Sequence, residues 1–188
     1  DKEEKKMKKK DGVYEEYYPK GQLYWKGRFS RNMKETYKDG KKDGVWEYYY
    51  EDGQLSYKGM YKDGKKEGVW EEYYHNGALY LKATYKDDEE NGVWEEYYEN
   101  GYLEFKGMYK DGKEDGVWEE YNENGQLLCK GSYKDGKKEG LWRHYFWMSD
   151  SHRSLHSVEL FQNDELIDKE QIAPDDLAKK SVLTSRYK

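Results

Sequence analysis

The residues that could do chemistry in this chain are its histidines, its acidic runs, its single cysteine and its many aromatic side chains. Three of the four histidines lie near the C-terminal end, and His152 and His156 are four residues apart. That spacing brings two side chains to one face only in a helix, whereas the surrounding sequence SDSHRS is typical of a turn. We therefore expect no histidine metal site there.

The acidic run DDEEN, residues 87–91, provides four carboxylates that could attract a hard cation or a basic partner. A Ca²⁺ site needs roughly six to eight oxygen ligands placed by a defined loop. We interpret the run as a solvated acidic turn, and we expect neither a metal nor a cofactor.

Cys129 has no second cysteine with which to form an internal disulfide. In the repeat described below it takes the same place as Trp25, Tyr57, Leu81 and Phe105, which predicts a small buried apolar side chain. The sequence contains no recognisable Ser/His/Asp or Cys/His constellation, and no glycine-rich phosphate loop between a strand and a helix. We therefore do not expect an enzyme.

The aromatic side chains are the remaining candidates, with 22 Tyr and 7 Trp among 188 residues. Such side chains are common anchors of protein interfaces. The net charge of -6 disfavours nucleic acid and anionic membranes as partners, because both attract proteins rich in Lys and Arg. No apolar run reaches about 18 residues, so no membrane-spanning helix is expected.

An internal repeat positions these aromatic residues. A glycine precedes an aromatic residue by two positions, and successive glycines are 32, 24, 24, 24 and 24 residues apart: Gly12, Gly44, Gly68, Gly92, Gly116 and Gly140. The aromatic residues are Tyr14, Trp46, Trp70, Trp94, Trp118 and Trp142. A tyrosine follows three residues later, at Tyr17, Tyr49, Tyr73, Tyr97, Tyr121 and Tyr145. Such a period indicates a fold built from stacked identical units.

Each copy is predicted to form a β-hairpin. The first strand, VWEEYY, is aromatic and β-prone. An Asp-Gly or Asn-Gly pair follows and favours a type I′ turn, at Asp52-Gly53, Asn76-Gly77, Asn100-Gly101 and Asn124-Gly125. A second turn, Lys-Asp-Gly-Lys-Lys, leads into the next copy. Turn residues recur too often for helices of about ten residues.

A two-residue loop at Asn76-Gly77 predicts the strand register. It places Glu71 opposite Lys82 and Trp70 opposite Ala83. Equivalent charge pairs are Glu47–Lys58, Glu95–Lys106 and Glu119–Lys130. The same register places tryptophans over glycines of their own hairpin: Trp46 over Gly59, Trp94 over Gly107 and Trp118 over Gly131.

The alternation of side chains along a strand then separates two faces of the sheet. One face is apolar, with Trp46, Tyr50, Leu55, Tyr57, Gly59 and Tyr61. The other is mixed, with Val45, Glu47, Tyr49, Gln54, Ser56, Lys58 and Met60. Glu72, Glu96 and Glu120 fall on the apolar face, and the sequence offers no explanation for them.

The 24-residue unit, with its pattern Gly-Val-Trp-Glu-x-Tyr-Tyr-x-Asn-Gly-x-Leu-x-x-Lys-Gly-x-Tyr-Lys-Asp-Gly over 21 positions, resembles the bacterial variant of MORN repeats, over about residues 11–147. The resemblance implies an all-β fold, an elongated single-layer antiparallel β-meander of about six 24-residue hairpin repeats, used as an interaction scaffold. Bacterial proteins with this variant are often labelled antitoxins of toxin–antitoxin pairs. Other members of the wider family are linked to membrane lipids and to the assembly of larger structures.

Three segments depart from the repeat. Residues 1–10 are predicted to be a charged flexible lead-in. The insertion RFSRNMKE, residues 28–35, is interpreted as an eroded repeat or a tolerated surface insertion, with a partner-contacting extension as the alternative. Residues 148–188 are predicted to cap the array, with a hairpin turning at Asn163-Asp164 and a short helix in APDDLAKKSVL. A tail that docks into a partner is the alternative.

These features predict a non-catalytic scaffold for a protein partner, with an antitoxin or immunity protein that occludes a toxin as the first hypothesis. The alternatives are an exported or surface-attached protein that binds host or envelope protein or carbohydrate, and a lipid-headgroup binder. An open apolar face would also allow a homodimer. The expected contact residues are Tyr49, Tyr73, Tyr97, Tyr121, Trp70, Trp94, Arg28 and Arg31. An antitoxin would be cytoplasmic, whereas a signal peptide preceding Asp1 would place the protein outside the cell or in its envelope.

Overall fold

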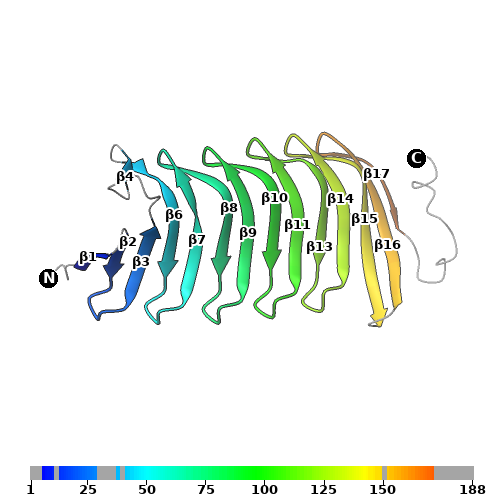
Figure 1. Cartoon of the computed structure of the whole chain (residues 1–188). Helices are drawn as coiled ribbons and strands as arrows, with labels where there is room; N and C mark the ends of the chain where they lie inside the picture. The colour runs from blue at the N-terminus through cyan, green and yellow to red at the C-terminus, as the bar shows by residue number, and fades with distance from the viewer. Residues whose placement is uncertain (1–5, 11–12, 29–36, 39–40, 150–151, 172–188) are drawn as a thin grey trace. The chain divides into compact units, whose positions relative to one another are not determined.

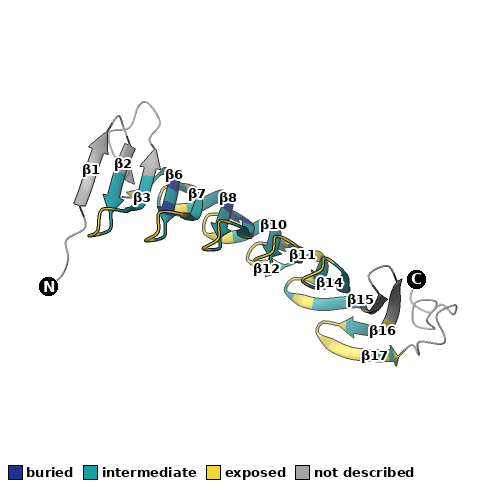
Figure 2. Cartoon of the chain, turned by 90° about the horizontal axis from the view of Figure 1, so that it is seen from below, coloured by how far each residue is buried: buried dark blue, intermediate teal, exposed yellow. Residues whose placement is uncertain are grey.

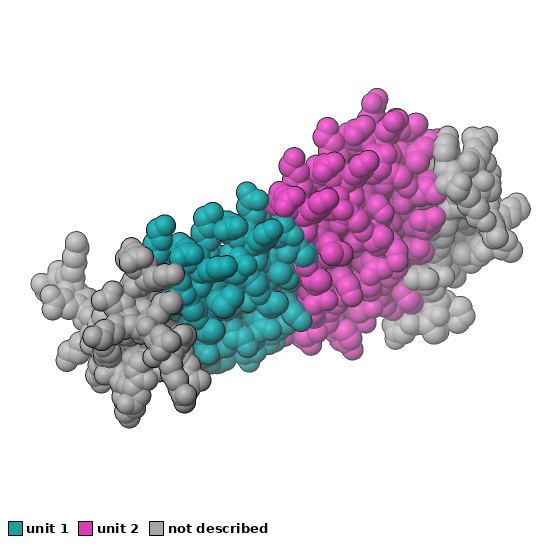
Figure 3. Space-filling view, turned by 45° about the horizontal axis from the view of Figure 1, so that its top comes forward, with its two compact units in different colours: residues 1–92 teal, residues 93–188 magenta. Residues whose placement is uncertain are grey.

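The structure, a computed structural model, describes residues 6–10, 13–28, 37–38, 41–149 and 152–171. The chain divides into two units, residues 1–92 and 93–188 (Figure 3). Each unit is an open antiparallel sheet made of consecutive hairpins, and no helix occurs in the described part of the chain. The predicted all-β hairpin meander is therefore confirmed.

The first unit contains seven neighbouring strands, in the spatial order in which they follow along the chain (Figure 1). They are β1 (Lys6–Lys10), β2 (Val13–Tyr17), β3 (Leu23–Arg28), β6 (Gly44–Tyr49), β7 (Leu55–Lys62), β8 (Lys65–Tyr73) and β9 (Leu79–Lys86). β4 (Tyr37–Lys38) and β5 (Lys41–Lys42) pair separately. β10 (Glu89–Tyr97) begins at the end of this unit.

The second unit continues from β10 with the same kind of hairpins. Its strands are β11 (Leu103–Lys110), β12 (Lys113–Glu114), β13 (Gly116–Tyr121), β14 (Leu127–Lys134), β15 (Lys137–Ser149), β16 (His152–Gln162) and β17 (Glu165–Gln171). β12 pairs with β11, and the remaining strands follow one another in sequence order. In the long hairpin of β15 with β16, Ser149 pairs with His152, so the chain reverses within SDSHRS as predicted, although His152 and the two residues after it already belong to β16.

The predicted register is confirmed in the body of the hairpins and wrong near their turns. Glu71 lies opposite Lys82 and Trp70 lies opposite Ala83, as expected. The register then shifts by one residue, so that Tyr73 lies opposite Leu79. The same shift occurs between β6 and β7 and between β13 and β14.

The shift arises because the Asn-Gly loop is longer than predicted. The N–H of Gly77 donates to the carbonyl of Tyr74 at 2.9 Å, and the N–H of Tyr74 donates to the carbonyl of Ala78 at 2.8 Å. Gly77 has a positive φ of 83°, whereas Asn76 does not have a positive φ. Instead the Asn76 side chain accepts a hydrogen bond from the N–H of Ala78 at 2.8 Å. The loop is thus a three-residue connection with a left-handed glycine, and the type I′ assignment is wrong.

Type I′ geometry occurs at the turns between repeats instead. Asp63 and Gly64 both have positive φ, 51° and 88°, as this turn requires. The acidic run adopts the same form at Asp87 (φ 55°) and Asp88 (φ 75°), and the Asp88 carboxylate accepts the Lys66 N–H at 2.6 Å. Asp87 and Asp88 therefore form a turn, as the sequence predicts, whereas residues 89–91 of the run already belong to β10.

The ends of the chain only partly follow the prediction. The lead-in over residues 1–10 was expected to be flexible, but Lys6–Lys10 form β1 and pair with β2. The turn at Asn163-Asp164 is confirmed, with positive φ at both residues. The helix expected within residues 173–183 and the insertion residues 29–35 lie outside the described residues.

The core of the sheet is the face that carries the tryptophans, which we call the tryptophan face. Trp46 and Trp70 are 2% and 1% exposed, and Figure 2 shows buried residues in β6 and β8. Neighbouring rings pack edge to face: Trp70 lies between Tyr61 at 4.9 Å and Tyr85 at 6.4 Å, measured between ring centroids. Large aromatic side chains thus cover one another on a single layer.

Where a glycine lies opposite a tryptophan, the tryptophan of the next repeat covers it. A Cβ at Gly59 would lie 2.1 Å from the ring of Trp70, whereas the sequence predicted cover from Trp46. Two further pairs follow the same rule, Gly107 with Trp118 and Gly131 with Trp142. The glycine is therefore a contact between repeats and not within one hairpin.

Candidate functional site

Four of the predicted contact tyrosines occupy equivalent positions on the face opposite the tryptophans, which we call the tyrosine face. Each hydroxyl donates to the carboxylate two residues earlier, on the same side of its strand. The pairs are Tyr49–Glu47 at 2.7 Å, Tyr73–Glu71 at 2.7 Å, Tyr97–Glu95 at 3.0 Å and Tyr121–Glu119 at 2.8 Å. Tyr17 makes the same contact with Glu15 in the first repeat, so the short motif Glu-x-Tyr builds this contact in five repeats.

A lysine from a neighbouring strand completes each contact. The N–O distances are 2.8 Å for Lys26–Glu47, 2.7 Å for Lys58–Glu71, 3.8 Å for Lys106–Glu95 and 2.7 Å for Lys130–Glu119. In the first unit the lysine belongs to the preceding hairpin, and in the second unit it belongs to the hairpin of its own glutamate. Each tyrosine ring is thus fixed beside an ion pair.

The charges of these groups are set by their contacts. Hydrogen bonds from Lys58 and then from Tyr73 lower the pKa of Glu71. Burial, followed by the hydrogen bond to Glu119, raises the pKa of Tyr121 to about 12. Near neutral pH the Glu71 carboxylate is therefore charged and Tyr121 is neutral, so the tyrosine hydroxyl is the donor in this kind of contact.

A row of exposed apolar residues lies on the same tyrosine face. Its members are between 39% and 51% exposed: Val45, Met60 and Val69 in the first unit, and Val93, Met108 and Val117 in the second. Val45 and Met60 are opposite one another on β6 and β7. Strand alternation correctly placed both residues on the mixed face. The sequence did not single them out as contact residues, because their exposure depends on which face of the sheet is packed.

The two predicted contact tryptophans lie on the tryptophan face and do not join this surface. Trp70 is buried on the tryptophan face. Trp94 is half-buried, and its indole N–H donates to Glu96 at 2.7 Å, which gives one of the unexplained apolar-face glutamates a role. Arg28 ends β3 and lies opposite Val45 of the apolar row, and Arg31 lies outside the described residues.

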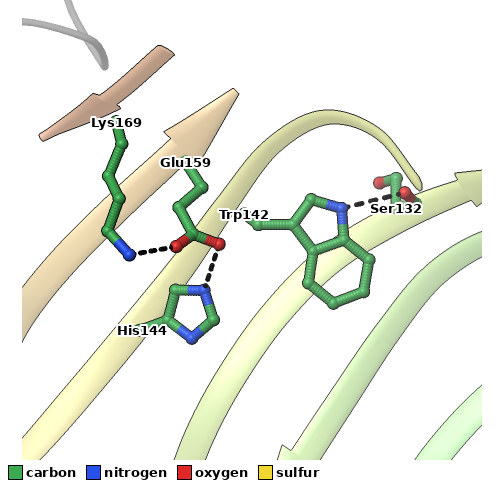
Figure 4. A network of polar contacts seen from close by, with 5 residues as sticks. All are labelled: Ser132, Trp142, His144, Glu159 and Lys169. Carbon is green, nitrogen blue, oxygen red and sulfur yellow. Dashed lines mark hydrogen bonds and ion pairs between the residues drawn. The ribbon is translucent and has the colours of Figure 1, made fainter. Parts of the chain in front are cut away.

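The chemically reactive side chains have structural contacts. His144 Nε2 lies 3.1 Å from Glu159, which also accepts from Lys169 at 2.6 Å (Figure 4). Cys129 is buried as predicted, and burial raises the pKa of its thiol to about 11. Within the described residues, no group of three His, Cys, Asp or Glu side chains is arranged to hold a metal.

The repeat corresponds to a known family. The MORN repeat variant family matches residues 10–27, 42–63, 66–87, 90–111 and 114–135. Because these matches cover more than half of the chain, the protein belongs to this family. MORN repeat proteins are generally non-catalytic repeat scaffolds for binding.

Two further findings concern relatives and membrane-spanning helices. A search of curated proteins found no match to the chain. The described residues include no helix with the length and apolar character needed to cross a bilayer.

Proposed function

We propose that the protein is a scaffold that binds a partner protein through its tyrosine face, and that it acts as an antitoxin or immunity protein by covering a toxin. The observation that carries the proposal is the row of half-exposed Val and Met side chains beside the Lys–Glu–Tyr contacts. Repeated exposed apolar side chains bordered by polar groups are typical of interaction surfaces.

The tyrosines suit such a surface because their orientation is already fixed. Tyr73 is held by Glu71, and Lys58 lies 5.7 Å from the centroid of its ring. A side chain ordered before binding loses less conformational entropy when a partner arrives. The apolar row supplies buried area and the tyrosines supply anchors, which is the usual anatomy of a protein interface.

The alternative functions have less support. Stacking of sugars or pairing of two copies through the tryptophan face of the first unit would need open indole faces, but Trp46 and Trp70 are almost fully buried by their own neighbours. Binding of lipid headgroups would need free cations, but Lys26, Lys58 and Lys130 on the tyrosine face are within 2.8 Å of carboxylates. We therefore favour a protein partner.

Site-specific photo-crosslinking tests the proposed surface. A photo-reactive phenylalanine analogue is placed at Val69 or at Val117, which are 50% and 51% exposed on the tyrosine face. Irradiation in cells that naturally contain the protein is expected to give the same partner from both positions. The matched control position is Leu166, 49% exposed on β17, which is expected to give no such product. A partner captured only from Leu166 would contradict the proposal.

The antitoxin role needs a separate test. The captured partner is expressed alone and together with the chain in a heterologous host. Growth arrest by the partner, relieved by co-expression, is the expected result. A harmless partner would retain the scaffold function and exclude the antitoxin role.

A further inference from the structure

In three repeats the chain places a lysine ammonium over its own tryptophan. The Nζ-to-centroid distances are 4.8 Å for Lys42 and Trp46, 4.7 Å for Lys66 and Trp70, and 4.5 Å for Lys138 and Trp142. A second ring of the same hairpin faces each ammonium, namely Tyr61 at 4.6 Å, Tyr85 at 4.5 Å and Phe161 at 5.1 Å. This is the geometry of cation–π binding.

The lysine stands four residues before the tryptophan, and the fifth repeat has Glu114 at that position. The rings are nevertheless present. Trp118 lies between Tyr109 at 5.3 Å and Tyr133 at 5.8 Å, the counterparts of the rings around Trp70. The fifth repeat therefore has the aromatic part of the arrangement and lacks its cation.

A cavity of about 180 Å³ lies beside these rings, with Trp118, Tyr133, Glu120 and Cys129 in its lining. Cys129 is smaller than Leu81, which takes the same place in the third repeat and is buried. A void of this size accommodates the end of a lysine side chain, since one water occupies about 30 Å³ of liquid.

The polar groups around the cavity favour a positive charge. The Glu120 side chain lines the cavity and has no hydrogen bond or ion pair within the described part of the chain. The Glu114 side chain does not line the cavity, and among the described residues it has no hydrogen bond or ion pair either. Burial, followed by the negative charge of Glu114, raises the pKa of Tyr133, and Glu120 adds to this effect.

We propose that the cavity beside Trp118 and Tyr133 binds a primary ammonium group, in the place that Lys66 fills in the third repeat. The group is carried by a lysine of a partner protein or by a free alkylamine. The site lies on the tryptophan face and does not depend on the function proposed for the tyrosine face.

Lys138 also lines the cavity, but its ammonium is engaged over Trp142. Two equivalent ammonium positions are one hairpin apart, which is about 10 Å at the usual strand spacing. Lys42 and Lys66 already occupy neighbouring positions of this kind in the first unit. Screening by physiological salt makes repulsion at this separation small.

Indole N–H resonances of the ¹⁵N-labelled chain provide the test. Loss of one of the seven indole cross-peaks in Trp118→Phe assigns the Trp118 signal. Titration with N-acetyl-lysine methylamide is expected to move this signal along a saturating curve in the millimolar range. The matched neutral compound, N-acetyl-norleucine methylamide, is expected to leave it in place. Butylammonium in a third titration distinguishes a free amine from a lysine side chain as the better ligand.

Two reciprocal variants sharpen the test. Glu114→Lys restores the chain's own lysine, so the Trp118 signal is expected to be shifted without ligand and to respond no further. Glu114→Gln is the control and is expected to weaken binding by roughly two- to five-fold. Lys66→Glu opens the equivalent position in the first unit and is expected to make the Trp70 signal respond to the lysine compound.

Three results would overturn the proposal. The Trp118 signal could fail to move with either amine across the millimolar range. It could move equally with the norleucine compound, which would mean that the cavity takes any apolar chain. The Glu114→Lys variant could bind like the wild type. None of these results would affect crosslinking from Val69 or Val117.

Discussion

The two faces of the sheet use aromatic side chains in opposite ways. On the tryptophan face, rings such as Trp70 pack against rings and a glycine of adjacent strands and are nearly inaccessible. On the tyrosine face, rings such as Tyr73 are half-buried, and their hydroxyls bind a carboxylate that also pairs with a lysine. The same residue class therefore stabilises one face and prepares a surface on the other.

This difference shows how a single layer of strands forms a core without a second layer packed against it. Indole rings are large enough to fill the space over the glycine of the neighbouring strand and to touch the next tyrosine. The opposite face is then free of a packing role. Exposed Val69 and Val117 are tolerated there without any contribution to the core.

The largest expected effect is the loss of a core tryptophan. Trp70→Ala removes a ring that is 1% exposed and should lower the free energy of unfolding by about 3–5 kcal/mol. Tyr73→Ala, in the same strand on the other face, should cost about 1 kcal/mol. Urea unfolding of both variants measures the contrast. Equal losses would mean that the two faces share the core.

The next effect tests the contact between repeats. Gly59→Ala introduces a methyl group 2.1 Å from the Trp70 ring and should cost about 1–3 kcal/mol through overpacking. In a Trp70→Ala background the same change should cost little, because the opposing ring is gone. A double-mutant cycle measures this coupling. A cost that is unchanged in that background would refute the assignment of Trp70 as the cover.

The smallest effect concerns the ion pairs of the tyrosine face. The pKa of Glu71 is lowered in the folded chain, so its contribution to stability is present above the ordinary value of 4.5 and is lost as pH falls below it. The Lys58–Glu71 coupling should be about 0.5–1 kcal/mol at pH 7, because the pair is partly exposed. It should vanish at low pH. The free energies of unfolding of the Lys58→Met and Glu71→Gln single and double variants, at pH 7 and at a pH below 4.5, measure the coupling. A coupling independent of pH would contradict the ion pair between Lys58 and Glu71.

The sequence predicted the hairpins and their register because charge pairing and strand alternation agree on one alignment, as in Glu71 with Lys82. It misplaced the turn types. An Asn-Gly pair is compatible with two loops. In one the asparagine has a left-handed backbone, and in the other its side chain accepts a hydrogen bond from a backbone N–H two residues later, as the Asn76 side chain does.

The cover of Gly59 was misassigned for a related reason. In a periodic array a glycine has a tryptophan on each side, and spacing alone does not decide which ring packs over it.

The candidate surface was predicted only through its tyrosines. The exposed Val and Met row and the cavity at Trp118 depend on packing in three dimensions, which no short motif encodes.

The most direct test of the division between the faces is a paired measurement on one variant. The double change Val69→Glu and Val117→Glu places charge on the tyrosine face at half-exposed positions. The control double change, Leu166→Glu and Ile167→Glu, alters residues that are equally exposed on β17. Affinity for the crosslinked partner and the free energy of unfolding are measured for both.

The tyrosine-face variant is expected to lose at least about tenfold in affinity while its free energy of unfolding changes by no more than about 0.5 kcal/mol. The control is expected to change neither. Retained affinity in the tyrosine-face variant, or a loss of stability equal to its loss of binding energy, would contradict the division of roles between the two faces.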